Sequence, residues 1–228
     1  MTSAGPAEVA VDSPRAAAPA RPRWLVGLLV TFFAVALVAT GGAVAVVAGI
    51  GQPQQPADGS VDVGFARDMI THHDQAVQMA QMARDHSTDP AVRLLAFDIE
   101  TQQLGQIGQM RGWLQTWGQP EQTDRAHMAW MGSAAGHLHE GGRMPGMAST
   151  AEMAKLKTLS GKALDTFFLQ LMIRHHEGGL AMAQYGAAHA GVDYVRDLAG
   201  KIVSAQTSEV VAMEQMLRER GGTPLPSD

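Results

Sequence analysis

The sequence FARDMITHHDQAVQMAQMA at residues 65–83 recurs as FLQLMIRHHEGGLAMAQYG at residues 168–186. The match extends without a gap over residues 65–118 and 168–221, at a constant offset of 103 residues, and about a third of the paired positions are identical. Chance rarely produces so long an ungapped match, and internal repeats of this kind mark a duplicated structural unit. The sequence therefore predicts a domain built from two copies of one unit.

Each copy has the pattern of two helices joined by a short break. Apolar residues recur at three- and four-residue spacing, which is typical of an amphipathic helix. In the first copy, Asp89 and Pro90 supply an N-cap residue and a proline at the first position of a second helix. In the second copy, Gly191 separates the helices and Gly221-Gly222 ends the last one. The sequence predicts helices at about 62–85, 90–117, 164–190 and 193–220.

Two helical hairpins can bury their apolar stripes against each other, and the result is an all-α four-helix bundle. We predict this bundle over residues 61–222, from hairpins 62–118 and 164–221. A connector rich in Met and His, residues 119–163, joins the hairpins. Within it, Ser149-x-x-Glu152 predicts a capping box that opens a short helix.

An apolar segment near the N-terminus predicts one membrane-spanning helix. Residues 24–50 contain no charged side chain and are long enough to cross a bilayer. Arg15, Arg21 and Arg23 precede the segment, and the next basic residue is Arg67. The positive-inside rule therefore places the N-terminus in the cytoplasm and the helical domain outside, on a single-pass anchor in the cell membrane. The alternative is a cleaved signal peptide, after which the same domain is secreted.

Composition defines the flanking segments and excludes some functions. Residues 1–23 are rich in Ala and Pro and predict a disordered cytoplasmic tail, and residues 51–60 (GQPQQPADGS) predict a flexible linker. The net charge is −5 and the basic residues are scattered, so we expect no nucleic-acid partner. The chain has no cysteine, which excludes disulfides, thiolate metal sites and cysteine nucleophiles.

The Met-x-x-His-His motif places its two histidines on opposite flanks of the predicted buried stripe. With about 100° per residue, His72, Met79 and His86 form a line on one flank, and His73 lies on the other. The two histidines of a pair therefore face different neighbouring helices. The stripe between them consists of small residues that allow the helices to approach closely. The second copy repeats the arrangement with His175, Met182, His189 and His176.

The repeated histidines and methionines predict a metal site. Buried imidazoles need partners, and packing alone does not explain histidines at symmetric positions in both copies. Methionine is abundant, with 14 residues, and its thioether either fills gaps in a core or binds soft metals. The predicted ligands are His72, His73, His175, His176, Met69, Met79, Met172, Met182, His86 and His189.

The donor types favour copper. Carboxylate-bridged di-iron bundles use Glu-x-x-His, and this motif is absent from the chain. Met69 and Met172 stand where that Glu would be, and a set of Met and His with few acids suits Cu(I). Silver follows by the same softness, and zinc bound through the histidines is the alternative.

The repeated blocks, with MPGMASTAEMAKLKTLSG between them, resemble the domain-of-unknown-function 305 family over about residues 61–221. The resemblance implies a ferritin-like, exported bundle and, for members such as the CopM proteins, copper or silver binding through Met and His. The resemblance supports the residues of both Met-x-x-His-His motifs, together with Met79 and Met182, as metal ligands. The family's second helices usually carry Gln-x-x-Glu, which Gln206-x-x-Glu209 matches and Gln103-x-x-Gln106 does not.

The leading hypothesis is an extracytoplasmic, membrane-anchored protein that sequesters or transfers copper. One alternative is a ferritin-like metal oxidase acting on Cu(I) or Fe(II). Another is a helical interaction domain without metal, whose protein partner is unknown. The connector is either a metal-capture arm or a loop that packs its methionines, and it carries His127, Met128, Met131, His137, His139, Met144 and Met147.

Overall fold

The computed structural model describes residues 22–48, 55–134 and 142–226. The predicted tail up to residue 21, the first part of the predicted linker, and the connector residues His137 and His139 lie outside these ranges. The chain divides into two compact units, residues 1–54 and 55–228, which are described separately.

The first unit contains one helix, α1 (Arg23–Val47), which is long and apolar enough to cross a membrane. Its two threonines are satisfied within the helix, because their hydroxyls donate to backbone carbonyls four residues earlier. Thr31 donates to Gly27 at 3.0 Å and Thr40 donates to Ala36 at 2.7 Å. Internal satisfaction of polar groups is what a lipid environment requires. The helix fits a membrane anchor or a signal peptide.

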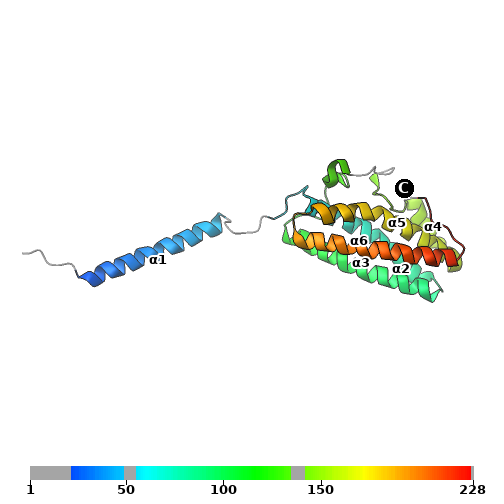
Figure 1. Ribbon diagram of the computed structural model, residues 1–228, viewed down its shortest axis with the longest axis horizontal. Helices are drawn as coiled ribbons and strands as arrows, with labels where there is room; N and C mark the ends of the chain where they lie inside the picture. The colour runs from blue at the N-terminus through cyan, green and yellow to red at the C-terminus, as the bar shows by residue number, and fades with distance from the viewer. Residues whose placement is uncertain (1–21, 49–54, 135–141, 227–228) are drawn as a thin grey trace, which may run out of the picture. The chain divides into compact units, whose positions relative to one another are not determined.

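The second unit is the predicted four-helix bundle. Its helices are α2 (Val61–His86), α3 (Pro90–Thr116), α5 (Gly161–His189) and α6 (Asp193–Glu219). Figure 1 shows α2 with α3 and α5 with α6 as two hairpins that lie side by side. The hairpins meet through α2 and α5, which run antiparallel: the carboxylate of Asp62 accepts from the backbone N–H groups of Gly191 and Val192, at 3.1 and 2.8 Å. The prediction of an all-α bundle from a duplicated hairpin is confirmed.

Local capping chemistry sets the helix ends. The side chain of Asp89 accepts from the first free N–H groups of α3, with Pro90 in the first turn. Gly118 and Gly221 follow α3 and α6 with φ values of 65° and 71°. This left-handed backbone is open to glycine because it has no Cβ, and it allows the chain to leave the helix.

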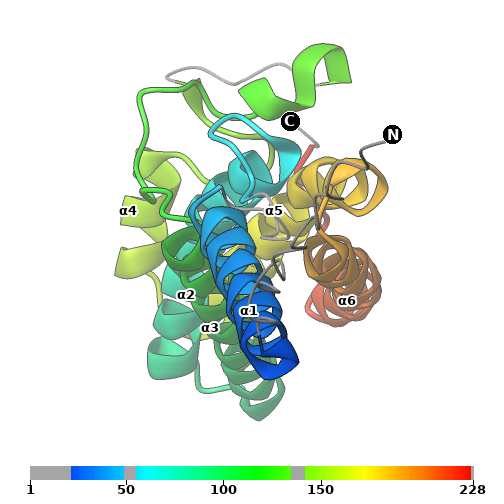
Figure 2. The ribbon, with the colours of Figure 1, turned by 90° about the vertical axis from the view of Figure 1, so that its left-hand side faces the viewer.

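The connector covers the outside of the bundle. It contains a 3₁₀ helix, η1 (Ala129–Ala134), and a short helix, α4 (Thr150–Thr158). The predicted capping box opens α4, because Ser149 and Glu152 satisfy each other's backbone N–H groups. Figure 2, viewed from one end of the bundle, shows α4 and the loops of the connector outside the four long helices. The sequence did not predict η1, since so short a segment has no detectable period.

Small residues allow α2 and α5 to approach closely, as predicted. A Cβ on Gly186 would lie 2.7 Å from the ring of Phe65, and one on Gly179 would lie 2.9 Å from Cε1 of His72. Ala76 and Ala80 on α2 are completely buried in the same interface. This contact brings the two Met-x-x-His-His motifs together in the middle of the bundle.

Candidate metal centre

The first histidines of the two motifs meet inside the bundle. His72 comes from α2 and His175 from α5, and both have 0% exposure. Their ring centroids lie 3.8 Å apart, with the planes tilted by 38°. The antiparallel contact between the two helices therefore places equivalent residues of the repeat face to face.

The connector holds one of these two rings. The Nε2–H of His72 donates to the backbone carbonyl of Pro145 at 3.2 Å, which leaves Nδ1 as the ring's lone-pair nitrogen. The segment after Pro145 is fixed in turn by Gln75, whose amide accepts from the N–H of Ala148 at 2.6 Å and donates to its carbonyl at 2.9 Å. Sequence reasoning did not identify Pro145 or Gln75, because backbone acceptors and connector paths leave no sequence signal.

The second histidine of each motif faces the other helix of its own hairpin. The Nε2–H of His73 donates to Oε1 of Gln106 on α3, and the Nε2–H of His176 donates to Oε2 of Glu209 on α6, both at 2.6 Å. Gln106 and Glu209 occupy equivalent positions of the repeat. The two histidines of a pair thus have different helix neighbours, as predicted. The contact of His73 is made to Gln106, the residue that stands where the family usually has Glu.

Burial keeps three of the four imidazoles neutral at pH 7. It lowers the pKa of His72 to about 4 and that of His73 to about 3, because the interior disfavours the charged ring. Burial also lowers the pKa of His175 well below its usual value. A neutral imidazole carries a lone pair on one nitrogen, and this is the form that binds metals.

Several polar atoms in the centre have no hydrogen-bond partner among the described residues. They are Nδ1 of all four motif histidines, Nε2 of His175, and amide atoms of Gln103 and Gln206. Buried unsatisfied polar atoms are costly and uncommon, and each calls for a physical explanation. The lone pairs of neutral imidazoles are donors for a metal ion, so the chemistry of these atoms suits one.

The two glutamines were not among the predicted site residues. A Cβ on Gly179 would lie 3.2 Å from Oε1 of Gln206, which places that amide beside His72. The sequence does carry a signal for them: Gln103 and Gln206 are identical between the copies at positions that face the core, where a polar residue is unusual.

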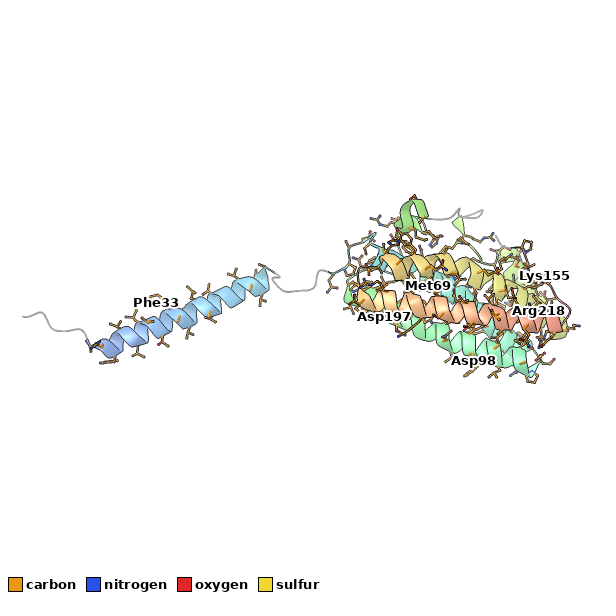
Figure 3. All side chains as sticks on the ribbon, viewed as in Figure 1. Phe33, Met69, Asp98, Lys155, Asp197 and Arg218 are labelled. Atoms are coloured by element: carbon orange, nitrogen blue, oxygen red, sulfur yellow. The ribbon has the colours of Figure 1, made fainter. Side chains whose placement is uncertain are left out.

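The predicted methionine ligands lie on both sides of the histidines, and all four have 0% exposure. Met69 and Met182 belong to one apolar cluster, and Met79 and Met172 belong to the other. Figure 3 shows Met69 within the bundle. The thioethers therefore lie on both sides of the His72–His175 pair, where they pack the core.

His86 and His189 are not brought together with the pair. Both are exposed at the C-terminal ends of α2 and α5, which lie at opposite ends of the bundle because these helices run antiparallel. At 1.5 Å per residue, fourteen residues of helix separate His86 from His72 by about 21 Å.

In the described ranges, no three His, Asp or Glu side chains gather in a group that could hold a metal ion.

The connector residues have different environments. Met128, Met131 and Met144 are buried, whereas Met147 is half-buried. His127 is exposed, with Nδ1 hydrogen-bonded to a carboxylate. The connector therefore packs some of its methionines and presents other residues to solvent.

Comparison with known proteins identifies the family. A family model described as "Domain of unknown function (DUF305)" matches residues 62–217. A crystal structure of a DUF305 protein from Streptomyces coelicolor, described as secreted, is 44% identical, covers 75% of this chain and 99% of its own, and superposes with a TM-score of 0.69. A DUF305 fragment from Deinococcus radiodurans is 35% identical, covers 73% and 99% of the two chains, and has a TM-score of 0.59.

CopM in its Cu(II)-bound form is 26% identical, covers 69% of this chain and 96% of its own, and has a TM-score of 0.54. No curated protein matches the chain significantly. The family model covers most of the chain, and both DUF305 structures match nearly over their full length. The chain belongs to the DUF305 family.

Proposed function

We propose that this protein binds Cu(I), and Ag(I) by the same chemistry, in the middle of its bundle. The observation that carries the proposal is the contact between His72 and His175, two buried rings of lowered pKa whose Nδ1 atoms have no partner. His73 and His176 flank this contact. The proposed thioether donors to this pair are Met69 and Met172, each one helical turn from it. Met79 and Met182 lie seven residues, about 10 Å, along the helices from the histidines and would hold metal only beside the pair.

The donor set supports a soft monovalent ion. Imidazole nitrogen and thioether sulfur are ligands that Cu(I) prefers, whereas Ca²⁺ and Mg²⁺ require oxygen. The hydrogen bonds from His73 to Gln106 and from His176 to Glu209 orient these rings, as outer partners of metal-bound histidines usually do. The structure of CopM, which has a similar fold, has been solved in Cu(I)-bound and Ag-bound forms.

The proposed role is to sequester or pass on the metal outside the cytoplasm. The apolar helix α1 is proposed as a retained anchor, because its uncharged run is longer than the core of a usual signal peptide and a long polar leader precedes it. The basic residues before it give the orientation, with the bundle outside. The bundle would then be held at the outer surface of the membrane. Fractionation of cells that express the full chain tests this: the protein remains with the membrane after alkaline extraction if α1 is retained, and it appears in the medium if α1 is cleaved.

Metal binding can be tested on residues 55–228, which form a compact unit with its own core and correspond to chains that crystallise alone. The domain, purified without a tag, is titrated with Cu(I) in competition with a coloured chelator. The variant His72→Asn with His175→Asn is expected to weaken binding at least a hundredfold, since it removes both central lone pairs. Circular dichroism establishes that the variant is folded.

The variant His86→Ala with His189→Ala is the matched control, because it also removes two histidines of the repeat but from the exposed helix ends. We expect it to bind with unchanged affinity. Equal binding by the wild type and the central variant would contradict the proposal, as would loss of binding in the control alone.

A further inference from the structure

A cleft of about 570 Å³ lies between α2 and the connector, outside the central site. Its lining includes Asp68 and Gln75 from α2, His127 and Met147 from the connector, and Met153 from α4. Both methionines are half-buried and the side chain of His127 is 43% exposed, so the cleft is open to solvent.

Asp68 fixes the orientation of His127. One carboxylate oxygen accepts from Nδ1–H of His127 at 2.6 Å, and the other accepts from the backbone N–H of Met128 and from Nε1–H of Trp130, both at 2.7 Å. The carboxylate itself is buried. A carboxylate on one nitrogen of an imidazole directs the other nitrogen outward and makes it a better metal ligand. Nε2 of His127 has no partner among the described residues.

The backbone beside His127 adopts an unusual conformation. Met128 has a φ of 60° and is the only residue other than glycine with a positive φ in the described ranges. This left-handed backbone costs an L-residue energy and concentrates at functional sites. It allows the Met128 side chain to enter the core while its neighbour His127 stays exposed at the cleft.

The arginines of the cleft lining, together with Asp74 and Glu121, are engaged in ion pairs with residues beside it. Arg111 pairs with both Asp74 and Glu121, at 3.1 and 2.9 Å, and Arg67 and Arg125 both pair with Asp58. The lining carboxylates Asp74 and Glu121 are therefore already paired with a cation. Besides neutral amide and hydroxyl oxygens, such as those of Gln78 and Thr123, the lining offers the imidazole Nε2 and the two thioethers, which are its soft donors.

The α2 residues that hold the connector beside the cleft have no counterpart in the second copy of the repeat. Leu171 stands where the first copy has Asp68, and Gly178 stands where it has Gln75. The two replaced residues are the ones that hold the connector: Asp68 binds His127, and Gln75 binds Ala148. Met147 is two residues from Pro145, whose carbonyl holds His72, so the same connector segment borders the cleft and contacts the central pair.

We propose that this cleft is a second site for a soft monovalent cation, with Nε2 of His127 and the thioethers of Met147 and Met153 as its donors. The site goes beyond the proposed central one and does not require it. It faces solvent, so it takes up Ag(I) or Cu(I) directly from solution.

The test is calorimetric titration of residues 55–228 with Ag(I) in the His72→Asn, His175→Asn background, which lacks the central pair. This variant is expected to bind one Ag(I). Adding Met147→Leu and Met153→Leu is expected to weaken that binding at least tenfold, and adding His127→Ala instead does the same. The control adds Met82→Leu and Met216→Leu, which replace two half-buried methionines outside the cleft, and leaves the affinity within twofold.

The outcomes separate the two sites. The cleft site is overturned if the background variant binds no Ag(I), or if the cleft and control substitutions have the same effect. A different result is expected if the central pair binds no metal. The background variant then binds Ag(I) as tightly and with the same stoichiometry as the wild type, and only the cleft substitutions abolish uptake.

Discussion

His72 and His175 place their ring centroids 3.8 Å apart in the middle of the bundle, although 103 residues separate them in sequence. The contact depends on Gly179, because a side chain there would displace the ring of His72. It also depends on the connector, whose Pro145 carbonyl accepts from that ring. The relationship is therefore a product of the whole domain and is sensitive to substitutions outside the two histidines.

Gly179→Ala is expected to destabilise the domain by about 1–3 kcal/mol, because the added methyl group overpacks the interface. It should also weaken Cu(I) binding, since the new Cβ would lie 2.9 Å from Cε1 of His72. Urea denaturation and chelator competition measure the two effects. Gly108→Ala on the exposed face of α3 is the control, where a Cβ meets nothing within 4 Å. There we expect up to about 1 kcal/mol of stabilisation from helix propensity. Equal effects of the two substitutions would show that overpacking against His72 is not the cause.

The metal-free domain is expected to lose stability as the pH falls from 6.5 towards 4. The folded pKa values of His72 and His73 are about 4 and about 3, below the unfolded value, so the unfolded chain binds protons first. Each histidine then contributes a slope of about 1.4 kcal/mol per pH unit within this window. Urea denaturation from pH 7.5 to 4.5 measures the slope, and His73→Asn should reduce it whereas the exposed His86→Asn should not. A flat profile would show that these rings are not buried.

Glu209→Gln is expected to weaken Cu(I) binding about tenfold, because outer-shell partners of ligating histidines typically contribute 10–100-fold to affinity. The substitution makes the second copy resemble the first, where Gln106 already holds His73. Glu214→Gln on the same helix removes a carboxylate that pairs with the exposed Arg218 instead, and it should leave the affinity unchanged. Chelator competition compares the two variants, and indistinguishable affinities would argue against a role for His176.

Gln75→Ala is expected to speed the release of bound metal several-fold. It removes both hydrogen bonds to Ala148 and loosens the connector where it covers His72. Transfer of Cu(I) to an excess of chelator, followed by stopped flow, measures the rate. Gln102→Ala on the exposed face of α3 is the matched control. If Gln75→Ala releases metal no faster than the control, metal does not leave past the connector.

The sequence predicted those features that depend on periodicity. The repeat, the four helices and the opposite flanks of His72 and His73 all follow from helical spacing, which is local to each helix. An angular projection carries no distance along the helix axis, so it places His86 on the same flank as His72 although about 21 Å of helix separate the two. The hydrogen bonds of Asp68 and Gln75 depend on the path of the connector, which has no period to read.

The single carbonyl of Pro145 also makes the two central rings chemically different. It fixes the proton of His72 on Nε2, so that ring has one tautomer and one lone pair. His175 has no hydrogen-bond partner on either nitrogen among the described residues, and its proton is free to sit on either one. In the proposed site, His72 would present a preset ligand atom, whereas His175 could offer either nitrogen by exchanging tautomers. A pair of rings related by internal duplication thus divides into one with a fixed tautomer and one with an adaptable tautomer.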